Sequence, residues 1–240
     1  MLALTFDIDW ADDRVLAYTL DLLNKHHISA TFFCTHKVTL GGHEYALHPN
    51  YDGLADREKA VGVLKEIFPE AHGVRSHRMN FAPGRDIGIY EKFGISYDSN
   101  YAMPGVSGIA PFHLMNDLVE IPFYFGDGFL VHDGADAMDR FDLRNWLDDQ
   151  GGLKVFAFHP IHIFLNTNSN ALYQQCRPHF KNSEKLWSMR NKGTGVGTLF
   201  VELLRHISEN QIQTGTLSEI EIAYRKSLPA KIGKLEKVSA

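Results

Sequence analysis

The sequence is poor in cysteine, in excess positive charge and in long apolar runs. Its 240 residues include only two cysteines, Cys34 and Cys176, far apart and outside any Cys-x-x-Cys pair, which excludes a disulfide scaffold and a thiolate metal cage. Lysine and arginine number 24 against 29 aspartate and glutamate residues, so the net charge of −5 argues against nucleic acid as a partner. No run of about eighteen apolar residues is present, so we expect no membrane span.

No basic and apolar leader precedes the first apolar segment, which begins almost directly after Met1. We therefore expect a cytoplasmic protein. A hydrophobic content of 44% and a charged content of 22% are ordinary for a globular protein. A chain of 240 residues suits one α/β domain or two small ones. Because no internal repeat or compositional boundary is visible, we predict a single domain over residues 1–240.

The most informative segment is residues 4–9, Leu-Thr-Phe-Asp-Ile-Asp. Its apolar residues predict a buried strand, and Asp7 and Asp9 project from the same side of that strand because they are two residues apart. Two carboxylates at the end of a buried strand are costly unless a cation or an arginine lies beside them. We therefore favour a functional role, although capping of the next helix stays open for one of the pair or for Asp12 or Asp13.

The apolar pattern of the whole chain predicts alternating strands and helices. We expect strands at residues 4–9, 28–34, 44–48, 73–76, 95–98, 118–122, 128–131, 154–159 and 213–216. We expect helices at residues 13–25, 56–68, 84–93, 142–149 and 198–210, and a last one from residue 218. About seven short parallel strands, each followed by a helix or loop, favour an α/β fold in the form of an irregular, incomplete (β/α) barrel. A doubly wound sheet is the second choice.

Residues 166–197 form a long polar segment rich in glycine and asparagine, which we interpret as a flexible excursion and a candidate lid. The segment contains the run Gly193-Thr194-Gly195-Val196-Gly197. No strand precedes this run and no lysine follows it, so a flexible linker is a better interpretation than a phosphate-binding loop.

Polar side chains follow many of the predicted strands. They are Asp7, Asp9, His48, Arg75, His77, Asp98 and His159. The carboxyl ends of the strands of an α/β barrel share one mouth, so carboxylates, imidazoles and a guanidinium would meet there. Such a set suits a divalent cation, a general base and a general acid. Taken alone, His48 and His159 each precede a proline and could simply end a strand.

Several motifs together resemble the polysaccharide deacetylase family, that is, the NodB-homology family or carbohydrate esterase family 4. The Thr-Phe-Asp-Ile-Asp strand followed by residues 19–33 resembles the opening of that family. Later segments agree in order and spacing: Glu44-Tyr45-Ala46-Leu47-His48, Gly73-Val74-Arg75-Ser76-His77, Tyr97-Asp98-Ser99-Asn100, Val119-Glu120-Ile121-Pro122 and Phe156-Ala157-Phe158-His159-Pro160. The resemblance covers residues 3–222. The combination of His-Pro-Asn, Arg-Ser-His and His-Pro-Ile-His further resembles deacetylase-like proteins of O-antigen and other surface-polysaccharide gene clusters.

The resemblance implies a distorted (β/α)7 barrel that hydrolyses the N-acetyl group of an amino-sugar intermediate in surface-polysaccharide biosynthesis. Carried over, Asp7 is the general base, Arg75 holds it ionised, and His159 is the general acid. Asp9 and His48 are metal ligands, with zinc as the expected ion. A bound cation lowers the pKa of its water to about 7 and polarises the amide carbonyl, so the assignment is chemically consistent.

One motif departs from the family pattern. The family has a second histidine four residues after the first, and here Asp52 follows His48 at that spacing. An aspartate can also bind zinc, so we predict Asp9, His48 and Asp52 as the ligands. With two carboxylates this ligand set is more anionic than the family's set, so iron, manganese and nickel are further candidates for the bound ion. His77 could supply the missing imidazole instead.

Two other functions stay open. A chain that kept the fold and lost the chemistry would act as a carbohydrate-binding or assembly factor. The Phe-Asp-Ile-Asp segment also fits a phosphatase of the haloacid dehalogenase type, but that family expects Thr or Gly soon after and Trp10-Ala11 follows here. For the hydrolase, we expect an N-acetylated sugar or oligosaccharide as the partner. The sequence does not identify the sugar or the oligomeric state.

Overall fold

The computed structural model describes residues 1–229 except 10, 54–55, 134–137, 139–140 and 148–150. Its strands are β1 (Leu2–Ile8), β2 (Thr31–Cys34), β3 (Glu44–Leu47), β4 (Gly73–Val74), β5 (Tyr97–Asp98), β6 (Phe112–His113), β7 (Val119–Glu120), β8 (Phe125–Gly126) and β9 (Lys154–Phe158). They form one sheet in the order β6-β7-β5-β4-β3-β2-β1-β9-β8. The pairs are parallel except β6 with β7, which is antiparallel.

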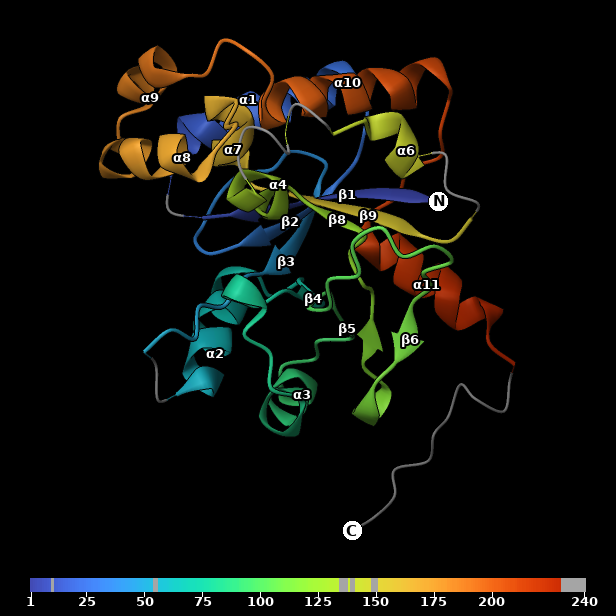
Figure 1. The fold of residues 1–240 in the computed structure, drawn as a ribbon. Coiled ribbons are helices and arrows are strands. Elements are labelled where there is room, and N and C mark those ends of the chain that lie inside the picture. The colour runs from blue at the N-terminus through green and yellow to red at the C-terminus, as the bar shows by residue number, and fades with distance from the viewer. Residues whose placement is uncertain (10, 54–55, 134–137, 139–140, 148–150, 230–240) are drawn as a thin grey trace.

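The α-helices surround this sheet (Figure 1). They are α1 (Asp13–Lys25), α2 (Arg57–Ile67), α3 (Pro83–Lys92), α4 (Asp127–Asp133), α6 (Leu143–Leu147), α7 (Pro160–Leu165), α8 (Asn170–Cys176), α9 (Ser183–Met189), α10 (Val196–Glu209) and α11 (Leu217–Ser227). Three short 3-10 turns are η1 (His77–Met79), η2 (Met115–Asp117) and η3 (Arg177–His179). No helix in the described ranges is long and apolar enough to cross a membrane.

The two ends of the strand order meet. β7 lies near one end and β8 at the other, yet only residues 121–124 separate them, a distance of at most about 17 Å. On the way, Phe123 N donates to Tyr101 O at 3.0 Å and Tyr124 N donates to Val155 O at 2.8 Å. Counted as one interrupted strand, β7 and β8 leave seven parallel strands in the described part of the chain. The predicted distorted barrel is therefore confirmed, and the doubly wound alternative was wrong.

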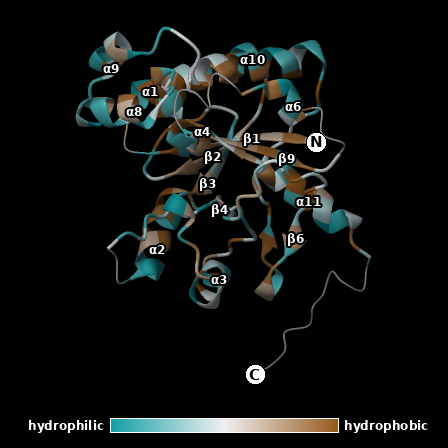
Figure 2. Ribbon diagram, viewed as in Figure 1, coloured by the Kyte–Doolittle hydropathy of each residue, from teal (hydrophilic) through white to brown (hydrophobic). Residues whose placement is uncertain are grey.

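The alternation of side chains along β1 separates two apolar layers. Ala3 packs inside the barrel with residues of β2, β5, β7 and β9, whereas Leu4 and Phe6 face the helices outside. Leu217 and Ile220 of α11 join the inner cluster and so close the barrel at its amino-terminal end. Figure 2 shows that the strands are mostly apolar (brown), whereas helices such as α2 and α10 carry both brown and teal stretches. The polar residues of β1 follow from this alternation, since Thr5 and Asp7 share the inner face with Ala3.

The predicted boundaries of the first helix agree with α1, and Asp12 is its cap. The Asp12 side chain accepts a hydrogen bond from Arg14 N at 2.9 Å. The capping role left open for the carboxylates near the strand therefore falls to Asp12. Asp7 and Asp9 stay available for another role.

Two predictions of local structure require correction. Residues 128–131, expected as a strand, belong to helix α4, because a short apolar run does not distinguish a strand from a buried helical turn. Residues 213–216, also expected as a strand, contribute only an isolated parallel bridge between Thr214 and Leu2. Residues 166–197, predicted as a flexible excursion, contain α8, η3 and α9 and pack on α1 and α7 through Cys176, Phe180 and Leu186. Whether this segment is flexible or moves as a lid stays a prediction.

The glycine run before α10 permits close packing. A Cβ atom on Gly195 would lie 2.2 Å from Asn166 O, and one on Gly197 would lie 2.5 Å from Ile163 O. Glycine is therefore required at both positions for α10 to approach α7. The run forms the start of a packed helix, and the linker interpretation was wrong for these two residues.

Candidate active site and metal centre

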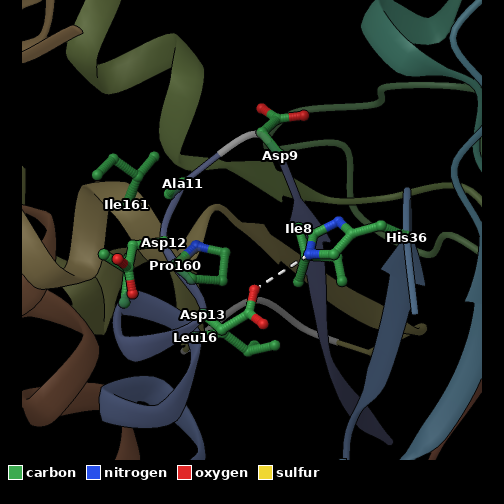
Figure 3. Close-up of a pocket in the computed structure, with 10 residues that line it drawn as sticks. Ile8, Asp9, Ala11, Asp12, Asp13, Leu16, His36, Pro160 and Ile161 are labelled. Atoms are coloured by element: carbon green, nitrogen blue, oxygen red, sulfur yellow. Dashed lines mark hydrogen bonds and ion pairs between the residues drawn. The ribbon is translucent and has the colours of Figure 1, made fainter. Parts of the chain in front are cut away.

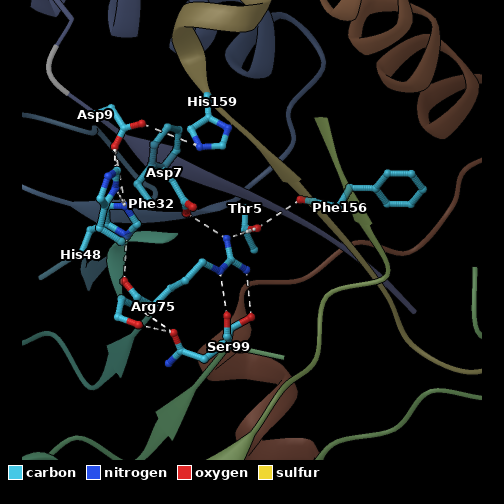
Figure 4. Close-up of polar contacts among 12 residues, drawn as sticks. Thr5, Asp7, Asp9, Phe32, His48, Arg75, Ser99, Phe156 and His159 are labelled. Atoms are coloured by element: carbon cyan, nitrogen blue, oxygen red, sulfur yellow. Dashed lines mark hydrogen bonds and ion pairs between the residues drawn. The ribbon is translucent and has the colours of Figure 1, made fainter. Parts of the chain in front are cut away.

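The candidate site lies where adjacent parallel strands end. Asp9 follows β1, His48 follows β3, Arg75–His77 follow β4 and His159 follows β9. In parallel strands the carboxyl ends share one edge, so side chains far apart in sequence converge there. Figure 4 shows Asp7, Asp9, His48, Arg75 and His159 turned toward one another at this end.

Three of these side chains form a compact triangle of donor atoms. Asp9 Oδ1 lies 3.7 Å from His48 Nε2 and 3.4 Å from His77 Nδ1, and the two nitrogens are 3.4 Å apart. Ligands bound at 2.0–2.1 Å to a tetrahedral zinc ion lie roughly 3.3–3.4 Å from one another. The triangle thus has the spacing of three ligands that share one divalent cation.

The protonation of His48 supports this interpretation. His48 is 2% exposed, and its Nδ1 lies 2.7 Å from the carbonyl oxygen of Arg75. A carbonyl only accepts, so Nδ1 carries the hydrogen and Nε2 presents its lone pair to Asp9 and His77. A hydrogen bond from the second ring nitrogen is the usual way in which a protein orients a metal-binding histidine.

Asp9 behaves as an ionised ligand without a hydrogen-bond partner at one oxygen. Burial raises the pKa of Asp9, but His48 and His77 outweigh it, so this pKa lies well below its usual value. Asp9 Oδ1 is nevertheless a buried atom that accepts no hydrogen bond within the described residues. An anionic oxygen left without a donor between two imidazole nitrogens is the environment that a cation completes. The donor set therefore fits a divalent metal ion.

The structure does not bring Asp52 to this group. The Asp52 carboxylate pairs with Arg78 at 3.0 Å and is 40% exposed, and His77 takes the place predicted for it. Side chains four residues apart share a face only in a helix, whereas the chain turns at Asp52, whose N–H donates to Asn50 Oδ1. The sequence signal for His77 was its position just beyond a strand end, directly after Ser76.

Arg75 fixes Asp7 inside the barrel. The Arg75 side chain is almost fully buried and donates to Asp7 Oδ1 at 2.9 Å and to Thr5 Oγ1 at 3.0 Å. Its other donors bind Ser99 O and Ser99 Oγ at 2.9 and 2.8 Å. Burial raises the pKa of Asp7, but the charges of Arg75, His48 and His159 lower it below its usual value. Asp7 is thus an ionised acceptor of fixed orientation next to Asp9.

His159 is held on the opposite side by Asp127, a residue that the sequence did not reveal. Asp127 is fully buried; its Oδ1 lies 2.7 Å from His159 Nδ1, and its Oδ2 accepts the His159 N–H at 2.7 Å. Burial lowers the pKa of His159, but Asp127, and then Asp9 and Asp7, raise it to about 10. His159 is therefore an imidazolium at neutral pH. Its Nε2 lies 3.8 Å from Asp9 Oδ2 and points at the metal triangle.

His162 adds a second imidazole to this side of the site. Asp127, His159 and His162 also bring ligand atoms within 4.8 Å of one another. The 2.7 Å contact of Asp127 with His159 is a hydrogen bond, so we interpret the two as an acid–imidazole dyad rather than as ligands of one ion. His162 Nδ1 lies 3.2 Å from Thr167 Oγ1, and burial lowers the pKa of His162 to about 4, which keeps that ring neutral.

A cavity of about 150 Å³ opens beside these groups. Its lining includes the polar side chains Asp7, His48, His77 and His159 and the apolar side chains Met79, Phe123 and Phe129. Polar groups that converge in a largely apolar pocket are typical of a small-molecule site. A lining of both kinds suits a ligand that carries polar and apolar groups, such as a sugar.

A second hollow lies behind the end of β1, and it is too small for a substrate. It measures about 20 Å³, enough for little more than one water molecule. His36 Nε2 pairs with Asp13 Oδ1 at 3.2 Å beside it, and Figure 3 shows the Asp9 carboxylate turned away from this pair. This hollow therefore has no room for a sugar.

Comparison with known proteins agrees with the fold and with the O-antigen resemblance. A family model described as WbmS-like polysaccharide deacetylase matches residues 4–177. The crystal structure of WbmS from Bordetella bronchiseptica, a candidate polysaccharide deacetylase involved in O-antigen biosynthesis, is 30% identical. That match covers 85% of this chain and 90% of WbmS, with a TM-score of 0.75. A comparison with curated proteins finds no match.

More distant structures share the fold. The Bc1960 peptidoglycan N-acetylglucosamine deacetylase is 14% identical, with a TM-score of 0.50 over 91% of this chain and 86% of its own. Peptidoglycan deacetylase PdaC from Bacillus subtilis is 12% identical, with a TM-score of 0.51 over 94% of this chain and 92% of its own. At these identities the likeness concerns the fold alone.

Proposed function

The chain belongs to the WbmS-like polysaccharide deacetylase family, and from this premise we propose that it is a metal-dependent hydrolase that removes an N-acetyl group from an amino sugar. The observation that carries the proposal is the triangle of Asp9, His48 and His77 beside two prepared proton carriers, Asp7 and His159. The O-antigen role given for WbmS supports an intermediate of surface-polysaccharide biosynthesis as the substrate.

The proposed roles follow from the charge state of each side chain. Hydrolysis adds water to the amide carbonyl, breaks the C–N bond and leaves a carboxylic acid and an amine. A divalent cation, when bound by Asp9, His48 and His77, supplies the positive charge that acidifies water and polarises the carbonyl. Asp7, ionised and oriented by Arg75, accepts the proton of the attacking water. His159, held cationic by Asp127, donates a proton to the departing amine nitrogen.

We propose zinc as the ion because two imidazoles and one carboxylate are a common zinc ligand set in hydrolases. The spacing of the three donor atoms also suits tetrahedral coordination. Iron, manganese and nickel accept the same donors, so metal analysis of the purified protein decides between them.

The structure weakens the case for the two other functions, a carbohydrate-binding or assembly factor and a phosphatase. The binding or assembly factor was suggested by the absence of a second histidine at residue 52, and His77 occupies the corresponding place beside Asp9 and His48. The phosphatase rested on the Phe-Asp-Ile-Asp segment alone, whereas a polysaccharide deacetylase model matches residues 4–177. A deacetylase is therefore the function that the geometry supports best.

The direct test is acetate release from N-acetylated oligosaccharides by the purified protein. We expect equal amounts of acetate and free amine, loss of both after chelation, and recovery on addition of Zn²⁺. Release of phosphate from an aryl phosphate, or full deacetylase activity in chelated protein, would oppose the proposal.

Substitution separates His77 from Asp52 as the third ligand. We expect His77→Ala to weaken Zn²⁺ binding by about 100-fold or more, because the triangle loses one of three donors. Asp52→Ala removes only an exposed pair with Arg78, so its affinity for Zn²⁺ stays close to wild type. Competition with a chromophoric chelator measures both. The opposite ranking of the two variants would restore Asp52 as the ligand.

A further inference from the structure

Two buried carboxyl groups, Asp98 and Glu120, lie behind the active site. Asp98 ends β5 and Glu120 ends β7, and the two residues are register partners in adjacent parallel strands. Both are fully buried. Their sequence neighbours Tyr97 and Val119 belong to the inner apolar cluster, so the two carboxyl groups project to the outer face of the sheet.

The hydrogen bonds around the pair leave one oxygen without a donor. Glu120 accepts the backbone N–H of Asn100 at 3.4 Å and of Tyr101 at 3.0 Å. Asp98 Oδ2 accepts from Asn100 Nδ2 at 3.0 Å, whereas Asp98 Oδ1 has no hydrogen-bond partner among the described residues. Two neighbouring buried carboxylates cannot both stay ionised at low cost. One proton placed between them would give Asp98 Oδ1 its missing donor.

In the described part of the chain, the hydrogen bonds to Asp98 and Glu120 come from Asn100 and Tyr101, and no arginine or lysine forms an ion pair with either carboxyl group. Arg57 of α2 donates to Asp86 at 2.6 Å and is already paired. The titratable groups that interact electrostatically with the pair come from α3 and adjoining segments: Asp86, Tyr51, Tyr90 and Tyr101. Burial raises the pKa of Asp98 to about 6, although hydrogen bonds from Glu120 and Asn100 lower it, and burial together with Asp98 raises the pKa of Glu120 well above its usual value.

Asn100 connects the pair to the active site. Asn100 Oδ1 accepts from Ser76 N at 2.9 Å and from Ser76 Oγ at 2.6 Å, so its amide nitrogen must point to Asp98. Ser76 lies between Arg75 and His77. The preceding residue, Ser99, binds the Arg75 guanidinium from inside the barrel. Ser99 and Asn100, which follow β5, therefore contact the Arg75–His77 segment from the inner and the outer face of the sheet, respectively.

The segment needs such an anchor because the turn after Ser76 is strained. Arg78 and Met79 have φ values of 55° and 53°, in the left-handed region that non-glycine residues rarely adopt. Strain of this kind persists only where surrounding contacts enforce it. The contact of Ser76 with Asn100 fixes the start of the turn that carries His77.

We propose that Asp98 and Glu120 share one proton and act, through Asn100 and Ser76, as positioning residues for His77 and Arg75. The positioning half rests on the proposed function, since it concerns a metal ligand and the partner of Asp7. The shared proton is a property of the fold and can be measured without substrate or metal.

Proton linkage to unfolding tests the shared proton. The native pair keeps a proton that the unfolded chain releases, so the free energy of unfolding falls as pH rises from 5 to 8. Glu120→Gln keeps the shape of the side chain: its amide oxygen can accept from Tyr101 N and its nitrogen can donate to Asp98 Oδ1, with loss only of the long 3.4 Å bond from Asn100 N. We expect the slope of unfolding free energy against pH to change by about one proton in Glu120→Gln. Glu221 is a buried carboxylate on α11 that pairs with Arg225, and it serves as the control. In Glu221→Gln the slope of unfolding free energy against pH should keep the wild-type value. An unchanged slope in Glu120→Gln overturns the shared proton.

Zn²⁺ affinity and kinetics test the positioning. We expect Glu120→Ala to weaken Zn²⁺ binding by about 10–100-fold and to lower kcat more than it raises KM, as loss of support behind a ligand does. Glu120→Gln should restore both close to wild type, whereas Glu120→Leu, which restores most of the volume without the polar group, should stay as weak as Glu120→Ala. Wild-type affinity in Glu120→Ala overturns the positioning. A wild-type chain that binds none of Zn²⁺, Fe²⁺, Mn²⁺ and Ni²⁺ overturns the proposed function and the positioning with it, while the unfolding measurement still decides the shared proton.

Discussion

Asp9→Asn is expected to lower kcat/KM for deacetylation by about 1,000-fold or more. Asp9 is the only carboxylate in the donor triangle, and its Oδ1 stands between His48 and His77 without a hydrogen-bond donor in the described structure. Asparagine keeps the shape and removes the charge, so the cation loses its one anionic ligand. The transition-state stabilisation supplied by a metal is worth several kcal/mol, and each 1.4 kcal/mol is about a factor of ten in rate. Initial rates of acetate release at saturating Zn²⁺ measure the effect.

Asp13→Asn is the matched control for this substitution. Asp13 lies four residues further along the chain, pairs with His36 at 3.2 Å and is 73% exposed. We expect its rate and its Zn²⁺ content to stay close to wild type. Equal activity of Asp9→Asn and Asp13→Asn would contradict the role given to Asp9.

Asp127→Asn is expected to reduce kcat by about 100-fold or more and to move the alkaline limb of the pH–rate profile. Burial lowers the pKa of His159, and Asp127 is the largest of the contributions that raise it to about 10. Without that charge the pKa of His159 falls, so the imidazolium is lost at lower pH than in the wild type and less of the general acid is protonated at neutral pH. General acid catalysis is worth about 10²–10⁴-fold in rate.

The pH dependence distinguishes this loss from misfolding. The wild-type rate should stay constant as pH rises through 8, because His159 is still protonated there, whereas the rate of Asp127→Asn should already decline. Asp56→Asn, at the cap of α2 where asparagine also serves, should keep the wild-type profile. A profile in Asp127→Asn parallel to that of the wild type at all pH values would remove His159 from the role of general acid.

The fold was largely predictable because alternating strands and helices leave a local periodicity. The apolar pattern of residues 13–25 predicted a helix with the bounds of α1, and the apolar run of residues 4–9 predicted most of β1. Closure of the barrel was harder to foresee, since it depends on the crossing at residues 121–124 between β7 and β8. The strand expected at residues 128–131 failed for a similar reason, because a few apolar residues carry no decisive period.

The site residues that directly follow a strand could be predicted. Those whose position depends on the path of a loop could not. Asp7, Asp9, His48, Arg75 and His159 lie together, as barrel geometry requires. Asp52 was chosen by a spacing that acts only in a helix, and the chain turns there instead. Asp127 gave no signal, because only the three-dimensional structure places it 2.7 Å from His159.

Anomalous X-ray diffraction from crystals grown with Zn²⁺ tests the central claim most directly. We predict one strong peak per chain within bonding distance of Asp9 Oδ1, His48 Nε2 and His77 Nδ1, at about 2.0–2.2 Å from each. The same crystals of Asp9→Asn should show the peak lost or greatly weakened. Peaks only at surface histidines, or an ion bound at Asp52 away from His77, would contradict the shared centre on which the hydrolytic proposal depends.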